Sequence, residues 1–473
     1  MTRWPGGRRV AGACVVLACA LLVALAADPA PNTPPVPVPT APPDPIAGAR
    51  KLFDDDRWQE ALDAARGLVA ADPNSAPARA LLADALYRRG DFDESEAAYR
   101  ASAAADPNFA PAHFGIGRIL RTIGRYGDAA ESFHRAATLD PNNPRYVRTL
   151  SNHLAKREDV IKLLTHYLDM PPVEGEGVIR NVRAWIELLK ELGDEPLGEI
   201  VTSDPTELPL NVLRGQAYFK ADVNTAAGQR FAFDTGATGL TISPRLAKLA
   251  KVKTIRPFTV TGMGGKGIVD GDLVLIKGLK LGGVSIRNVT ATIAEPKGDE
   301  EGLFGPPIVG SFRIRIDLDP GTLGLRLNDG AAPAASPASL SIPFRNVGGQ
   351  IFVKASLNGT PLNAMVDTGA SSSLATMSAA PRVPGLELLP GDWIQGKSVG
   401  LAGSLARKAL REATLTFGGI DFKADRMPCV DLSRFSRALE SEVYLVIGFP
   451  QLSRFVTEID YRTNTLTLTP KGK

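Results

Sequence analysis

Two aspartates carry the clearest chemical signal in this sequence. Asp234 opens an Asp-Thr-Gly-Ala motif, and Asp367 opens a second copy of it. Two carboxyl groups held close together cannot both ionise easily, so they share one proton over a wide pH range. One member of such a pair can take a proton from water while the other donates a proton to a substrate oxygen. The motifs therefore predict hydrolysis by an activated water, with no metal ion and no cofactor.

The residues around each aspartate predict how its carboxylate is presented. Residues 231–233 and 365–366 are apolar and predict a buried strand that ends at the aspartate. In each motif the glycine, Gly236 or Gly369, allows a tight turn directly after the strand. We expect both carboxylates to lie at strand ends, where two facing lobes can bring them together.

A longer internal repeat surrounds the two motifs. Residues 215–224, GQAYFKADVN, match residues 349–358, GQIFVKASLN, position by position. Both copies lie in a region of short β-branched and aromatic runs broken by Gly, Pro and Asn, which is typical of an all-β domain. We expect one lobe at 205–329 and a second at 341–473, separated by an Ala-Pro-Ser-rich linker at 330–340.

The paired motifs resemble the active-site loops of the pepsin and retropepsin superfamily of aspartic peptidases. The resemblance covers about residues 205–470 and implies that Asp234 and Asp367 are catalytic. It also implies that Thr235 and Thr368 exchange hydrogen bonds across the lobe interface beneath the carboxylates. Family members have an apolar-apolar-Gly segment that crosses behind each catalytic loop. The segments that we expect in this role are Ile308-Val309-Gly310 and Val446-Ile447-Gly448.

The motifs depart from the pepsin pattern at one position. Ala237 and Ala370 stand where many pepsins have a hydroxyl that donates to the carboxylate, and the retroviral-like branch has alanine there. Fewer donors to the charged form lower the pKa of an acid less. We therefore expect a mildly acidic pH optimum rather than one near pH 2.

A glycine-rich stretch after the first motif is the candidate flap. Residues 259–267, with Met263, Gly264 and Gly265 at their centre, resemble a hairpin that closes over substrate. An ordinary hairpin without this role is the alternative. In the second lobe, residues 400–403 occupy the corresponding place.

The region before the lobes contains a second kind of repeat. The triplet Asp-Pro-Asn recurs at Asp72, Asp106 and Asp140, so that successive copies are 34 residues apart. This period, with small and apolar residues in register, is typical of the tetratricopeptide helix pair. We expect repeats and capping helices over 46–200, the last helices lying at about 144–170 and 178–192.

Two interpretations of these helical repeats stay open. Their concave groove can bind a peptide or protein partner and so recruit substrate, or the repeats can be a rigid spacer. The predicted architecture is therefore an all-α tetratricopeptide solenoid followed by an all-β, two-lobed aspartic-protease-like domain.

The N-terminal residues predict export. A basic start and an apolar run over 1–27 favour a signal peptide, and an uncleaved membrane anchor is the alternative. A lipoprotein start at Cys19 is a weaker interpretation, because apolar residues follow the cysteine where a lipidated N-terminus is usually polar. Residues 28–45 are rich in proline and predict an extended linker. We expect a periplasmic or secreted protein, whose only contact with a membrane is through this segment.

Composition excludes some functions and leaves others open. Lys plus Arg number 54 against 51 for Asp plus Glu, with both signs scattered, and no nucleic-acid-binding motif is present. After removal of an export segment, Cys429 is the one remaining cysteine, which we expect to be buried and inert. The leading function is an aspartic endopeptidase acting on a peptide or protein substrate. The alternatives are a non-catalytic peptide-binding protein and an envelope scaffold.

Overall fold

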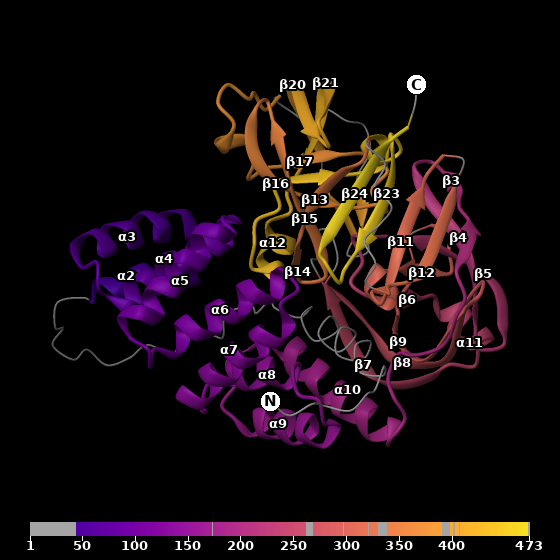
Figure 1. The fold of residues 1–473 in the computed structure, drawn as a ribbon, viewed down its shortest axis with the longest axis horizontal. Coiled ribbons are helices and arrows are strands. Elements are labelled where there is room, and N and C mark those ends of the chain that lie inside the picture. The colour runs from indigo at the N-terminus through magenta and orange to yellow at the C-terminus, as the bar shows by residue number, and fades with distance from the viewer. Residues whose placement is uncertain are drawn as a thin grey trace. The chain divides into compact units, whose positions relative to one another are not determined.

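The computed structural model describes residues 44–172, 174–261, 268–296, 298–319, 321–329, 338–389, 398–400, 403–405 and 407–471 (Figure 1). The predicted export segment and nearly all of the predicted linker lie outside these residues. Among the helices in these ranges, none is both long and apolar enough to cross a membrane. Contacts divide the chain into two compact units. One holds the helical repeats through Ile179 together with Ser436–Glu442, and the other holds Arg180–Phe435 and Val443–Lys473.

The helical unit is built from antiparallel helix pairs. The helices are α2 (Pro45–Asp54), α3 (Trp58–Ala71), α4 (Ala76–Arg89), α5 (Phe92–Ala105), α6 (Ala110–Thr122), α7 (Tyr126–Leu139), α8 (Pro144–Ser151) and α9 (Arg157–Asp169). The repeated aspartates Asp72, Asp106 and Asp140 are the C-cap residues of α3, α5 and α7, so each Asp-Pro-Asn triplet ends the second helix of a pair. The predicted all-α repeat region is confirmed.

Small residues let the paired helices approach closely. A Cβ atom at Gly117 of α6 would lie 2.7 Å from the ring of Phe133 in α7, and one at Gly115 would lie 2.1 Å from the ring of Tyr99 in α5. Both rings are buried. Between α4 and α5, Gly90 ends the helix with a φ of 86°, a left-handed conformation that favours glycine.

The end of the helical region differs in detail from the pattern in the sequence. The stretch expected as helical over about 144–170 is two helices, α8 and α9, separated by a turn. The next helix, α10 (Glu176–Leu192), begins in the helical unit, and from Arg180 onward its contacts group it with the β unit. Buried Asn181 exchanges two hydrogen bonds with the backbone of Thr259, at 2.7 and 2.8 Å. The domain ranges derived from the sequence stay predictions.

The β unit contains the two expected lobes. Lobe 1 contains β1 (Glu199–Ser203), β2 (Thr206–Pro209), β3 (Asn211–Leu213), β4 (Gln216–Val223), β5 (Ala226–Phe233), β6 (Leu240–Ile242), α11 (Pro244–Leu249), β7 (Lys253–Thr261), β8 (Ile268–Leu281), β9 (Val284–Ile293), β10 (Gly302–Phe304), the 3-10 helix η1 (Pro306–Val309), β11 (Phe312–Asp317) and β12 (Thr322–Leu327). Nine of these strands form one sheet, ordered β1-β9-β6-β10-β5-β4-β8-β7 with β3 paired to β4.

Lobe 2 repeats this plan. It contains β13 (Leu340–Pro343), β14 (Arg345–Val347), β15 (Gln350–Leu357), β16 (Thr360–Val366), β17 (Leu374–Thr376), η2 (Ala380–Arg382), β18 (Ser398–Gly400), β19 (Gly403–Leu405), β20 (Arg407–Phe417), β21 (Ile420–Val430), α12 (Ser433–Leu439), β22 (Leu445–Ile447), α13 (Phe449–Leu452), β23 (Phe455–Asp460) and β24 (Thr465–Pro470). The hairpin β15–β16 corresponds to β4–β5, as the ten-residue repeat predicted. The predicted all-β class is confirmed.

A shared sheet joins the two lobes. Its six strands are ordered β13-β24-β23-β11-β12-β2, so the closing hairpins of the two lobes meet at β11 and β23, which lie side by side in Figure 1. Ile314 pairs with Ile459 across this seam, and both are fully buried in one hydrophobic cluster that extends through both lobes. The lobes therefore have a common core, which fixes the position of one aspartate loop relative to the other.

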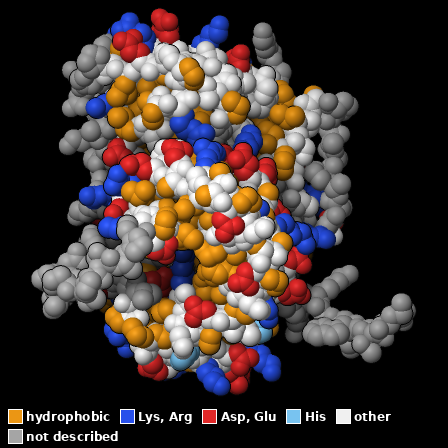
Figure 2. All heavy atoms as spheres, turned by 90° about the vertical axis from the view of Figure 1, so that its left-hand side faces the viewer, with side chains coloured by type: hydrophobic (Ala, Val, Ile, Leu, Met, Phe, Trp, Pro, Cys, Tyr) orange, Lys and Arg blue, Asp and Glu red, His pale blue; other side chains and the backbone are white. Residues whose placement is uncertain are grey.

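The charged surface agrees with the composition. Figure 2 shows one face of the molecule, on which acidic and basic side chains are interspersed with apolar ones. Among the described residues, exposed salt bridges join opposite charges, such as Arg57 with Glu60 and Arg287 with Glu199. On the face shown, the described residues form no large region of one sign.

Candidate active site

Each motif aspartate directly follows a central strand and is held there by a parallel neighbour. In lobe 1, β5 ends at Phe233, and the amide of Asp234 donates to the carbonyl of Phe304 in parallel β10 at 3.1 Å. In lobe 2, β16 ends at Val366, and the amide of Asp367 donates to the carbonyl of Ile447 in parallel β22 at 2.9 Å. In both lobes, therefore, a backbone hydrogen bond to a parallel neighbouring strand positions the aspartate.

The structure corrects one of the expected crossing segments. Val446-Ile447-Gly448 crosses behind the Asp367 loop as predicted, but its counterpart in lobe 1 is Leu303-Phe304-Gly305. The prediction of Ile308-Val309-Gly310 was wrong, because residues 306–309 form the 3-10 helix η1. The sequence pattern misled because an aromatic residue, Phe304, fills the buried strand position that an aliphatic residue fills in lobe 2.

Both true crossing segments end in a glycine that the motif loop requires. A Cβ atom at Gly305 would lie 2.4 Å from the carbonyl oxygen of Ala237, and one at Gly448 would lie 2.7 Å from that of Ala370. These contacts are with backbone, so the neighbour cannot rotate away. The glycines therefore allow the crossing strand to approach the aspartate loop.

We expect Gly305→Ala to lower the free energy of unfolding of the β unit by about 1–3 kcal/mol, the usual cost of forcing an extra carbon into a packed site. Gly239→Ala is the matched control, because a Cβ atom there meets nothing within 4 Å. Urea unfolding of both variants checks the correction. Equal stability of the two variants would show that close packing against the Asp234 loop does not require glycine at position 305.

The two motif threonines join the loops beneath the carboxylates. The amide of Thr235 donates to Oγ1 of Thr368 at 3.0 Å, and the amide of Thr368 donates to Oγ1 of Thr235 at 2.8 Å. Each hydroxyl then donates to a backbone carbonyl of the other lobe, Thr235 to Val366 at 2.8 Å and Thr368 to Phe233 at 2.9 Å. Both threonines are buried, and the reciprocal exchange implied by the resemblance is present.

The motif glycines bring the two carboxylates together. A Cβ atom at Gly236 would lie 2.8 Å from Cγ of Asp367, and one at Gly369 would lie 2.6 Å from Cγ of Asp234. Each carboxyl group therefore lies directly over the glycine of the opposite loop. Neither glycine has a positive φ. Close approach, rather than the turn geometry expected from the sequence, is what requires glycine here.

Burial raises the pKa of both aspartates, and the charge of Asp234 raises that of Asp367 further. Asp367 is 1% exposed, and both burial and the neighbouring charge of Asp234 hold its pKa well above the usual range. Burial also raises the pKa of Asp234, although amide donors such as Gly236, at 2.7 Å from Oδ1, act against the rise. In Asp367, Oδ1 accepts from the amides of Gly369 and Ala370, whereas buried Oδ2 has no hydrogen-bond partner among the described residues.

The structure adds residues that sequence reasoning did not assign. Gln216 donates through Nε2 to the carbonyl of Gly369 at 3.1 Å, and Gln350 donates likewise to Gly236 at 2.9 Å. Each glutamine thus supports the Asp-Thr-Gly-Ala loop of the other lobe. Both glutamines occupy the second position of the ten-residue repeat, and their identity in the two copies could have indicated an equivalent role in each lobe. Buried Glu300 also acts on the site, because its charge contributes to the raised pKa of Asp234.

Other residues singled out in the sequence have different outcomes. The candidate flap residues Met263, Gly264 and Gly265 lie outside the described residues, in the segment that follows β7 in the chain, and the flap stays a prediction. Of the corresponding stretch in lobe 2, Gly400 and Gly403 pair in the short β18–β19 hairpin. Cys429 is buried beside Met377, and burial raises the pKa of its thiol to about 11, which agrees with an inert structural cysteine.

Comparison with known families agrees with the geometry of the paired loops. Both lobes match the aspartyl protease family. The matches cover residues 219–308 and 353–450, and a tetratricopeptide repeat model matches residues 46–109 and 80–144. The sequence-based prediction of an aspartic-protease-like region after tetratricopeptide repeats is therefore confirmed.

Other comparisons are more distant. A search of curated proteins finds no match to the chain. Among solved structures, the aspartic proteinase from Irpex lacteus is similar at a TM-score of 0.39 and 13% identity, over 57% of this chain and 98% of that chain.

Proposed function

We propose that this protein is an aspartic endopeptidase in which Asp234 and Asp367 jointly activate a water molecule. The observation that carries the proposal is the reciprocal arrangement of the two loops, in which each carboxyl group lies over the opposite glycine and each threonine bonds the opposite backbone. The two loops and the aspartyl protease matches of both lobes support the same chemistry. The presence of both aspartates, in addition to the threonines that hold the loops together, favours an active enzyme over an inactive relative.

The geometry favours different roles for the two carboxyl groups. Asp367 is the more deeply buried and has the more strongly raised pKa, so it holds the shared proton. Asp234 then takes a proton from water as the water oxygen attacks the peptide carbonyl carbon. Asp367 donates its proton to the carbonyl oxygen, which yields a neutral gem-diol. In the second step Asp234 returns its proton to the leaving nitrogen, Asp367 takes one from a diol hydroxyl, and the carbon–nitrogen bond breaks.

The predicted cellular setting completes the proposal. We infer an exported, periplasmic or secreted enzyme, on the basis of the basic and apolar start of the sequence. The substrate is a peptide or protein segment, because the site lies between two lobes that can enclose an extended chain. The helical repeats add a second surface for protein contact.

A peptide-library assay tests the proposed activity. The purified full chain is incubated with the library at several acidic and neutral pH values, with and without pepstatin, and the products are read by mass spectrometry. We expect internal peptide bonds to be cut and pepstatin to block cleavage. Intact peptides at every pH, with peptide binding retained, would instead support a non-catalytic binding protein.

A further inference from the structure

Part of lobe 2 belongs structurally to the helical repeats. Residues Ser436–Glu442, at the end of α12 and just before β22, group with the repeats, whereas Phe435 before them and Val443 after them group with the β unit. The amide of Glu442 donates to the carbonyl of Arg88 in α4 at 2.8 Å, and Nη1 of Arg88 donates to the carbonyl of Ser436 at 2.7 Å. The repeats therefore hold the backbone of this acidic segment at both of its ends.

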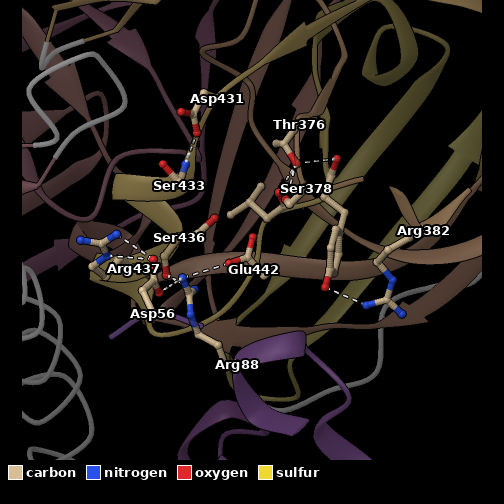
Figure 3. Close-up of polar contacts among 12 residues, drawn as sticks. Asp56, Arg88, Thr376, Ser378, Arg382, Asp431, Ser433, Ser436, Arg437 and Glu442 are labelled. Carbon is tan, nitrogen blue, oxygen red and sulfur yellow. Dashed lines mark hydrogen bonds and ion pairs between the residues drawn. The ribbon is translucent and has the colours of Figure 1, made fainter. Parts of the chain in front are cut away.

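Three arginines of the repeats face the two carboxylates of the acidic segment. Glu440 accepts from Arg118 at 2.7 Å and from Arg145 at 2.6 and 2.7 Å. Glu442 lies 2.9 Å from Arg88, and this pair is almost fully buried, with side chains 6% and 5% exposed. Arg88, Arg118 and Arg145 come from α4, α6 and α8, the first helices of successive pairs, and are called the arginine row. Figure 3 shows Arg88 pointing from its helix toward Glu442, Ser436 and Asp56.

The arginine row is fixed in place by other contacts. The guanidinium group of Arg118 stacks over the ring of Tyr87 at 3.9 Å, and that of Arg145 lies 4.9 Å from the ring centre of Phe114. Asp56 contacts Arg88 at 3.2 Å and also Arg437 of the acidic segment at 2.7 Å. A buried arginine needs an acceptor, because an unpaired charge removed from water is costly. The arginine row is thus a preformed site for carboxylates.

The backbone of the acidic segment gives an independent sign of this recognition. Glu440 has a φ of 55°, and the amides of Glu440 and Ser441 close the end of α12 by donating to Arg437 and Ser436 at 3.0 and 3.1 Å. Glycine is the usual residue at this left-handed position after a helix. Glu440 adopts this conformation although it is not glycine, and its carboxylate contacts two arginines. Burial acts to raise the pKa of Glu440, but Arg145, Arg118 and their neighbours outweigh it and hold the pKa at about 2.

We propose that the arginine row is a recognition site for an acidic Glu-x-Glu peptide segment, and that its occupant is the chain's own Ser436–Glu442. The repeats are then a receptor that already holds an internal ligand. An external acidic partner has to displace this ligand, which is present at an effective concentration on the order of millimolar because it is part of the same chain. This inference concerns binding only and does not depend on the proposed hydrolysis.

Hydrogen exchange of the full chain tests whether the acidic segment is held. The amide of Glu442 has its acceptor in the repeats, so we expect exchange in peptides covering 436–444 to be slow in the wild type and at least about tenfold faster in Glu440→Gln. Glu387→Gln, which removes an exposed carboxylate of lobe 2 paired with Arg411, is the control and should change nothing there. Peptides covering β4 and β5 report whether each variant is folded.

A second variant guards against misfolding. Arg145 is 39% exposed, so Arg145→Gln removes one contact to Glu440 without leaving a buried charge unpaired. It should also speed exchange over 436–444 while β4 and β5 keep wild-type rates. Wild-type exchange at the rate of an unstructured peptide, or no response to either variant, would overturn the proposal.

Binding in trans tests the recognition itself. A labelled synthetic peptide with the sequence of residues 434–444 should bind the Glu440→Gln/Glu442→Gln protein, in which the site has been vacated. It should not bind the wild type, or the vacated protein that also carries Arg118→Gln and Arg145→Gln. Equal binding to the wild type and the vacated protein, or no binding to the vacated protein, would contradict the assignment.

Discussion

Asp367→Asn and Asp234→Asn are each expected to lower kcat for peptide hydrolysis by about 10²–10⁴-fold, the contribution of a positioned acid or base. The asparagine side chain has nearly the same shape, so the loop geometry is retained. It can neither hold the shared proton nor accept one from water. The measurement is the rate of cleavage of a single peptide identified in the library assay.

The control for both variants is Asp421→Asn. Asp421 is exposed near the start of β21, where it accepts a hydrogen bond from Thr416 of β20 at 2.8 Å. Its replacement should leave kcat unchanged. The paired-carboxylate mechanism fails if either active-site variant keeps more than about a tenth of the wild-type rate while the peptide products stay the same.

Thr368→Val is expected to destabilise the β unit strongly. The substitution preserves shape but removes the hydroxyl that accepts from the amide of Thr235 and donates to the carbonyl of Phe233. Both backbone groups then stay buried without a partner, at a cost of about 1–3 kcal/mol for each group. The free energy of unfolding is measured from the urea dependence of hydrogen exchange in β4 and β5.

Thr368→Ser is the matched control, because serine keeps the hydroxyl and loses only a methyl group. It should retain most of the stability and most of the activity. Thr235→Val should behave as Thr368→Val does, since the hydrogen bonds are reciprocal. If the valine and serine variants at position 368 were equally stable, the exchanged hydrogen bonds would not be what joins the two aspartate loops.

The fold class and the aspartate loops were predictable because they leave local signals. The 34-residue period, the apolar run before each aspartate and the ten-residue repeat each fix an element without reference to the rest of the chain. The crossing strand of lobe 1 was not predictable in this way. Phe304 and Gly305 depart from the aliphatic pattern, and only their pairing with β5 and the Asp234 loop shows their role.

The remaining features depend on contacts between residues distant in sequence. No local pattern tells that Gly236 packs against the carboxylate of Asp367, or that Gln350 supports the loop of the other lobe. The acidic segment is a similar case. Glu440 and Glu442 look like ordinary surface charges after a short helix until Arg88 and Arg118, more than 300 residues earlier, are found beside them.

The most direct test of the central claim, that Asp234 and Asp367 act as one proton-sharing pair, is the pH dependence of kcat/KM. Burial and the charge of Asp234 raise the pKa of Asp367 well above its usual value, whereas the rise that burial causes in the pKa of Asp234 is limited by its hydrogen bonds with Asp367 and with backbone amides. The rate should rise as the first proton leaves the pair and fall as the second leaves, which gives a bell-shaped curve with a mildly acidic maximum. A maximum near pH 2, or a rate that keeps rising through neutral pH, would contradict this account.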